Sequence, residues 1–278
     1  EAQILSELLG YTLTQSELQA VFPTTQFPAV TSDPRNKLRD TSTDSLQVSD
    51  ALLQDLLAGV HADQPFTAAP EIFIGREEEL ARLHSYLGEA VAGQGRVAFI
   101  NGSAGSGKSA LMRAFAQKAL AEHPDLIVLD GSCSAYGGYG TPFMPFRDIL
   151  NGLLGHATTQ WATGTIRHNQ QRRVLRLAPY ILQVFANKCG DLIDTFVPAS
   201  ALTDQARALQ VQNLFSLDQL QTYLSIIEVA TSHPDREQHN LFVQYTTLLH
   251  LLSQRQPLML MIDDLHWADA ASVSLLFH

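Results

Sequence analysis

Three short apolar runs stand out along the chain, each bounded by polar or turn-forming residues. They are RVAFIN at Arg96–Asn101, DLIVLDGS at Asp125–Ser132 and PLMLMIDD at Pro257–Asp264. Runs of this length without polar alternation are typical of parallel strands that are buried on both faces. The pattern therefore predicts a parallel sheet with a strand over each of these ranges.

Helical periodicity fills most of the chain between the second and third runs. Segments such as QQRRVLRLAPYILQVFAN and EQHNLFVQYTTLLHLL repeat apolar residues at helical spacing. We therefore expect an α/β core that carries a large helical insertion over about residues 145–256. The main domain is expected over residues 71–278.

Residues 1–70 differ in composition from the rest of the chain. Two short helical patterns, Gln3–Leu9 and Thr14–Phe22, precede a stretch rich in Pro, Ser, Thr and Asp over Pro23–Ser45. We expect a helical and linker segment here. A third helical pattern runs from Ser49 or Asp50 to Val60. The region is either a linker with this helix, a docking helix or the end of an upstream domain.

Composition and charge narrow the classes of function. A hydrophobic content of 45% over 278 residues supports a substantial core, and 28 acidic against 18 basic residues give a net charge of −10. This charge argues against direct nucleic-acid binding by this segment. A basic run at helical spacing is expected to be a solvated helix face; it comprises Arg167, Arg172, Arg173 and Arg176.

The cysteines and the lack of an export signal favour the cytoplasm, and the chain ends suggest a fragment. The two cysteines, Cys133 and Cys189, are far apart, which fits a reducing cytosol better than a disulfide framework. No export signal and no apolar run of about 20 residues is present, so we expect a cytoplasmic protein that does not span a membrane. The chain begins at Glu1 and stops at His278 within an apolar run, which leads us to expect a fragment of a larger protein.

A glycine-rich motif lies between the first strand and the helical run ALMRAFAQKAL. The sequence GSAGSGKS fits G-x-x-x-x-G-K-[ST], the P-loop, in which backbone N–H groups and the following helix N-terminus bind phosphates. Lys108 is expected to reach the β- and γ-phosphates as a catalytic residue, and Ser109 to bind Mg²⁺. The predicted nucleotide-binding residues here are Gly102, Ser103, Ala104, Gly105, Ser106, Gly107, Lys108, Ser109 and Ala110.

Two carboxylates end the third apolar run, where open α/β sheets bind their ligands. We expect Asp263 to complete the Mg²⁺ site and Asp264 to polarise a water that attacks the γ-phosphate. The strand between the two motifs in the chain resembles the additional-strand, catalytic-acid class of P-loop NTPases. That class has a three-layer α/β/α fold with a parallel sheet, and the resemblance shifts the expected reaction toward ATP hydrolysis.

Four boxes together resemble the ATPase module of STAND regulators, which are AAA-related and similar to origin-recognition ATPases. They are FIGREEELARL at 73–83, the P-loop, YGTPFMPFRDIL at 139–150 and MLMIDDLHWAD at 259–269. The resemblance implies that Phe73, Ile74 and Gly75 border adenine, with Arg76 near the nucleotide. It also implies an ATP/ADP switch in a large bacterial multidomain signalling or transcriptional regulator, with self-association or partner domains in the intact protein.

Two departures and two alternatives accompany this resemblance. Asp264 stands where many AAA enzymes have Glu, which is associated with slow turnover. The chain also ends before any sensor residue, arginine finger or further strand; in this class the strand after the second motif lies between the two phosphate-site strands, so we expect the sheet to lack its middle strand. The alternatives are a nucleotide-bound scaffold with little hydrolysis and a DNA-handling ATPase of the origin-recognition kind. His266 and Trp267 are expected to pack the next helix rather than to sense the γ-phosphate.

Overall fold

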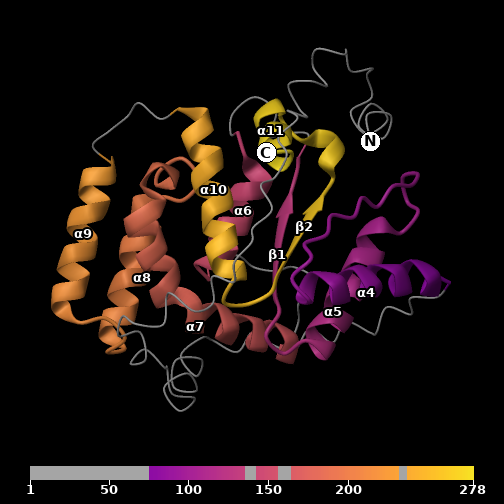
Figure 1. Cartoon of the computed structure of the whole chain (residues 1–278), viewed down its shortest axis with the longest axis horizontal. Helices are drawn as coiled ribbons and strands as arrows, with labels where there is room; N and C mark the ends of the chain where they lie inside the picture. The colour runs from indigo at the N-terminus through magenta and orange to yellow at the C-terminus, as the bar shows by residue number, and fades with distance from the viewer. Residues whose placement is uncertain (1–74, 135–141, 156–163, 232–236) are drawn as a thin grey trace, which may run out of the picture.

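The structure, a computed structural model, describes residues 75–134, 142–155, 164–231 and 237–278, with only the backbone of residues 164–168. Figure 1 shows the arrangement of these parts. The helical and linker patterns predicted within residues 1–70 lie outside the described residues, as do Phe73 and Ile74.

The described elements are mostly helical. In chain order they are α4 (Glu77–Val91), α5 (Lys108–Glu122), β1 (Ile127–Ser132), α6 (Met144–Leu153), α7 (Gly164–Lys188), the 3₁₀ turn η2 (Gly190–Leu192), α8 (Ala199–Val211), α9 (Leu217–Thr231), α10 (Gln238–Ser253), β2 (Leu258–Asp263), the 3₁₀ turn η3 (Leu265–Trp267) and α11 (Ala270–Leu276). None of these helices combines the length and the apolar character that a membrane crossing needs.

β1 and β2 form a parallel pair in which Ile127 aligns with Leu258 and Ser132 with Asp263. Successive side chains of β1 enter different cores: Ile127 packs with α6 to α10, whereas Val128 packs with α5. Figure 1 shows α4 and α5 on one side of the strands and α6, α8, α9 and α10 on the other, with α7 running below the strands. Both faces of β1 are therefore buried, which confirms the predicted strands over 125–132 and 257–264 to within two residues of each end.

The edge of β1 that faces away from β2 is closed by side chains of α7. Gln170 Nε2 donates to Val128 O at 2.7 Å, and Arg173 Nη1 donates to Leu126 O at 2.8 Å. Burial of Arg173 lowers the pKa of its guanidinium. The expectation of a solvated face is therefore wrong for Arg173, because the unpaired carbonyls of a strand edge attract a donor.

The strand predicted over Arg96–Asn101 does not form in this structure. Within the described ranges no strand pairs with this segment, and Val97 and Phe99 are 76% and 44% exposed. Arg96 donates instead to Glu89 of α4, and the Phe99 ring stacks on Phe277. An apolar run becomes a strand only where a second backbone supplies the hydrogen bonds, so the pattern alone misled the prediction.

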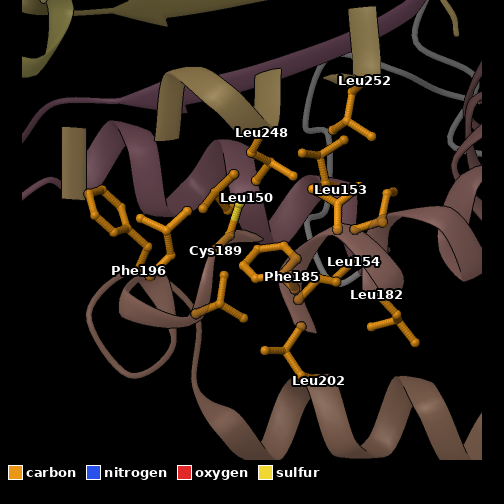
Figure 2. Packing of buried hydrophobic residues seen from close by; sticks show 14 of the residues in the cluster. Leu150, Leu153, Leu154, Leu182, Phe185, Cys189, Phe196, Leu202, Leu248 and Leu252 are labelled. Atoms are coloured by element: carbon orange, nitrogen blue, oxygen red, sulfur yellow. The ribbon is translucent and has the colours of Figure 1, made fainter. Parts of the chain in front are cut away.

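Helices α6 to α10 share one apolar core. Figure 2 shows side chains from four of them converging, among them Leu150 of α6, Phe185 of α7, Leu202 of α8 and Leu248 of α10. Cys189 lies within this core, where burial raises the pKa of its thiol to about 12. The Tyr245 hydroxyl of α10 donates to the Phe146 carbonyl of α6 at 3.1 Å, so α6 is fixed to this helical part.

Candidate functional site

The glycine-rich loop before α5 has backbone conformations that favour glycine. Gly105 and Gly107 lie in the left-handed region at φ values of 75° and 83°, which residues with a Cβ rarely adopt. A Cβ on Gly102 would come within 2.8 Å of Ser106 Oγ. The loop then enters α5 at Lys108, with Ser109 and Ala110 in the first helical turn.

Positive charge and hydrogen-bond donors gather at this loop. Lys108 Nζ donates to the carbonyl oxygens of Gly102 and Ser103 at 2.9 and 3.0 Å, so the side chain folds back over the loop. Among the described residues, no acceptor pairs with the backbone N–H groups of Gly107, Lys108 and Ser109. These donors and the α5 dipole fit the oxygens of a phosphate chain.

The P-loop meets the second motif through one hydrogen bond. Ser109 Oγ donates to Asp263 Oδ2 at 2.7 Å, and Asp263 is the last residue of β2. Mg²⁺ prefers oxygen ligands and in nucleotide sites takes one or two from protein, with phosphate and water completing the shell. The Ser109 hydroxyl and the Asp263 carboxylate supply two such oxygens side by side, so these two residues would fit this ion.

Asp264 follows directly and has an unusual backbone. Its φ of 56° is left-handed, and its N–H donates to Asp263 Oδ1 at 2.8 Å. The carboxylate is exposed, and its Oδ1 lies 3.9 Å from His266 Nδ1. The turn therefore directs adjacent carboxylates differently, one toward Ser109 and the other into solvent.

Negative charge accumulates at this end of the two strands. Burial, followed by the charges of Asp269 and Asp264, raises the pKa of the Cys133 thiol to about 11. Cys133 directly follows β1, and its N–H donates to Asp263 O at 3.1 Å. Within the described residues no group of three or more His, Cys, Asp or Glu side chains is arranged to hold a metal ion, so the protein ligands that this end of the strands offers to Mg²⁺ are those of Ser109 and Asp263.

Arg76 connects the segment before α4 to the P-loop. Its Nη2 donates to Ser106 O at 2.9 Å, and its Nη1 bonds to Glu79 Oε1 at 2.7 Å. The hydrogen bond from Arg76 holds the pKa of Glu79 below its usual range. Gly75, at a φ of 87°, begins the described part of this segment, so an adenine-side role for Phe73 to Arg76 stays a prediction.

His266 and Trp267 do not pack the next helix as expected. Trp267 is 51% exposed, and its ring lies 5.0 Å from that of His266 in a tilted contact. The expectation failed because both residues lie in the short turn η3, none of whose residues is buried.

Asp269 is the residue at this site that the sequence reasoning missed. It caps α11 by accepting from Ser272 N at 2.9 Å, and it also accepts from Phe143 N at 3.2 Å. The cap has a local signal, because Asp with Ser three residues later precedes an apolar run. The bond to Phe143 joins residues 126 positions apart and has no such signal.

Comparison with known proteins gives one assignment. Residues 72–278 match the family described as AAA ATPase domain, and the match contains the P-loop and both acids of the second motif. No curated protein and no solved structure gives a significant match. AAA ATPase domains have the P-loop NTPase α/β fold, bind nucleotide and usually use Mg²⁺. Since the match covers well over half of its length, the chain belongs to the AAA ATPase domain family.

Proposed function

We propose that this chain is the nucleotide-binding switch module of a multidomain signalling or transcription regulator of the STAND type. In this proposal it binds Mg-ATP or Mg-ADP and hydrolyses ATP slowly. The observation that carries it is the hydrogen bond from Ser109 to Asp263, which joins the P-loop to the end of β2. The contact supports the proposal because a P-loop hydroxyl beside a strand-end carboxylate is the arrangement expected of a Mg-nucleotide site.

The finer architecture belongs to the same proposal. A three-layer α/β/α fold of the additional-strand class would set another strand beside β2, on the edge away from β1. The exposed side chains of Leu260 on β2 and of Phe99 are compatible with such a neighbour. Self-association, a cytoplasmic location and the absence of direct nucleic-acid contact by this segment are further parts of the proposal.

In this proposal four side chains share the chemistry of the site. Lys108 binds the β- and γ-phosphates, and Ser109 with Asp263 holds Mg²⁺, which when bound supplies charge neutralisation to the phosphates. Asp264 accepts the proton of the attacking water, since its exposed carboxylate adjoins the metal site. Its side chain is one carbon shorter than Glu, which favours slow turnover and suits a switch.

Asp264→Asn is expected to keep the parental nucleotide affinity and to lower turnover about tenfold. This is a smaller fall than removal of a well-placed general base causes. Asn tolerates the left-handed backbone of Asp264, so the turn is preserved. Single-turnover cleavage of ATP measures the effect. Asp204→Asn, an exposed change on α8, is the matched control. Unchanged turnover in Asp264→Asn removes this residue from the base role.

Two other outcomes would favour the alternative functions. Tight nucleotide binding without cleavage in the parent favours the scaffold. Salt-dependent DNA binding by the intact protein favours the DNA-handling ATPase.

Metal removal tests the second half of the site. With EDTA, ATP binding by the parent is expected to weaken about tenfold, about 1.4 kcal/mol, because Ser109 and Asp263 would no longer hold an ion that neutralises the phosphate charge. In Asp263→Asn the same treatment is expected to change the affinity by less than about twofold. Titration calorimetry with and without Mg²⁺ gives both values. An equal EDTA effect in the two proteins contradicts the assignment of Asp263.

A further inference from the structure

Residues 264–268 connect β2 to α11, and both ends of this connection are tied to other parts of the chain. At the near end, Cys133 N donates to Asp263 O and fixes it beside β1. At the far end, Asp269 is bonded to α11 and to the start of α6. Asp264 therefore lies in a short segment that is held on both sides.

The Asp269 carboxylate uses its two oxygens for different partners. Oδ1 accepts from Ser272 N at 2.9 Å and caps α11. Oδ2 accepts from Phe143 N at 3.2 Å and from the Ser272 hydroxyl. One carboxylate thus satisfies donors from two helices, and only Oδ2 makes the contact with α6.

Phe143 is a rigid anchor for this contact. Its φ of 65° is left-handed, and its N–H donates to Asp269 Oδ2. Its buried ring lies 4.9 Å from the Phe196 ring and 6.0 Å from the Phe242 ring. The N–H that Asp269 binds is therefore fixed by side chains of the helical part.

We propose that Asp269 is a positioning residue for Asp264, because it fixes the far end of the 264–268 connection to α6. The inference rests on the proposed role of Asp264 in hydrolysis. It also makes the helices α6 to α10 a determinant of turnover. The Phe143 ring is packed in their shared core, and the Phe143 N–H in turn holds the 264–268 connection. Lys108, Ser109 and Asp263 lie outside the connection, so binding and turnover should separate.

Asp269→Asn tests the inference with little disturbance of α11. Asn remains a good N-cap through Oδ1, but its NH₂ group replaces the oxygen that accepts from Phe143 N. We expect Kd values for ATP and ADP within about twofold of the parent and a turnover about tenfold lower. Ser272→Ala is the matched control, because it removes a bond to the same Oδ2 but leaves Phe143 bound, and it should turn over at the parental rate.

A double substitution separates positioning from a general loss of structure. If Asp269 acts through Asp264, Asp269→Asn lowers turnover in the parent but has no further effect in the Asp264→Asn background. Equal effects in both backgrounds overturn the inference. Reduced nucleotide affinity in Asp269→Asn overturns it too, since that result places the damage at the P-loop.

Amide exchange supplies a readout that does not depend on hydrolysis. Within the connection, Trp267 N donates to Asp264 O at 2.8 Å and Ala268 N to Leu265 O at 3.0 Å. These amides should exchange at least about tenfold faster in Asp269→Asn and at the parental rate in Ser272→Ala. If these amides exchange at the parental rate in Asp269→Asn, the inference is overturned. This test also applies if the parent binds nucleotide without cleaving it. Failure of the parent to bind nucleotide instead contradicts the proposed function. If circular dichroism shows Asp269→Asn to be unfolded, Asp269→Ser, which keeps a capping oxygen but is too short for Phe143, takes its place.

Discussion

Replacing Lys108 with alanine is expected to weaken ATP and ADP binding about 100-fold, or about 2.7 kcal/mol. The Lys108 ammonium bonds to Gly102 O and Ser103 O at the loop, where the N–H groups of the α5 N-terminus also point. A phosphate chain takes the place of these carbonyls as the partner of the ammonium, and each such charge-assisted bond is stronger than a neutral one. Titration calorimetry with each nucleotide measures the loss.

A lysine elsewhere on the same helix provides the control. Lys118 of α5 is exposed and lies 3.9 Å from Glu122, so Lys118→Ala removes the same charge from the same helix at a distance from the loop. This variant should bind nucleotide with the parental affinity. If Lys108→Ala binds as tightly as Lys118→Ala, the P-loop is not the phosphate site. Equal melting temperatures for the two variants establish that the loss is local.

Local sequence features predicted the parts of the fold that depend on burial. β1 and β2 were identified because both faces of each strand meet apolar side chains, which leaves an uninterrupted hydrophobic run. Arg96–Asn101 has the same kind of run, but a ladder also needs a neighbouring backbone, and composition does not contain that information. Closure of the outer edge of β1 by Gln170 likewise depends on where α7 lies.

The candidate site likewise contains residues that the sequence could predict and residues that it could not. The P-loop and Asp263 could be predicted because phosphate and metal chemistry demand particular residues at fixed spacing. The sequence could not predict the contacts of Asp269 and Arg76, because each of these side chains bonds to a backbone atom far away in the chain. Any residue has a backbone N–H or C=O, so such contacts leave no pattern in the sequence of the partner.

Gly131→Ala is expected to lower the free energy of unfolding by about 3 kcal/mol or more. Gly131 lies on β1 where α6 crosses it, and a Cβ there would come 2.1 Å from Pro145 O and 2.8 Å from Pro145 Cα. These are backbone atoms of the first turn of α6, which cannot rotate aside as a side chain can. Chemical denaturation followed by circular dichroism measures the change.

The result also bears on the nucleotide site, because the close approach at Gly131 sets where α6 begins and so where Phe143 meets Asp269. Gly88→Ala is the control: Gly88 lies within α4 with nothing within 4 Å of an added Cβ. There the same methyl group should stabilise the protein by about 0.5–1 kcal/mol, through the better helix propensity of alanine. Opposite signs for the two substitutions follow from the contact of α6 with β1. A Gly131→Ala protein as stable as the parent would show that α6 does not approach β1 this closely, and would remove the support for the Phe143 to Asp269 contact as well.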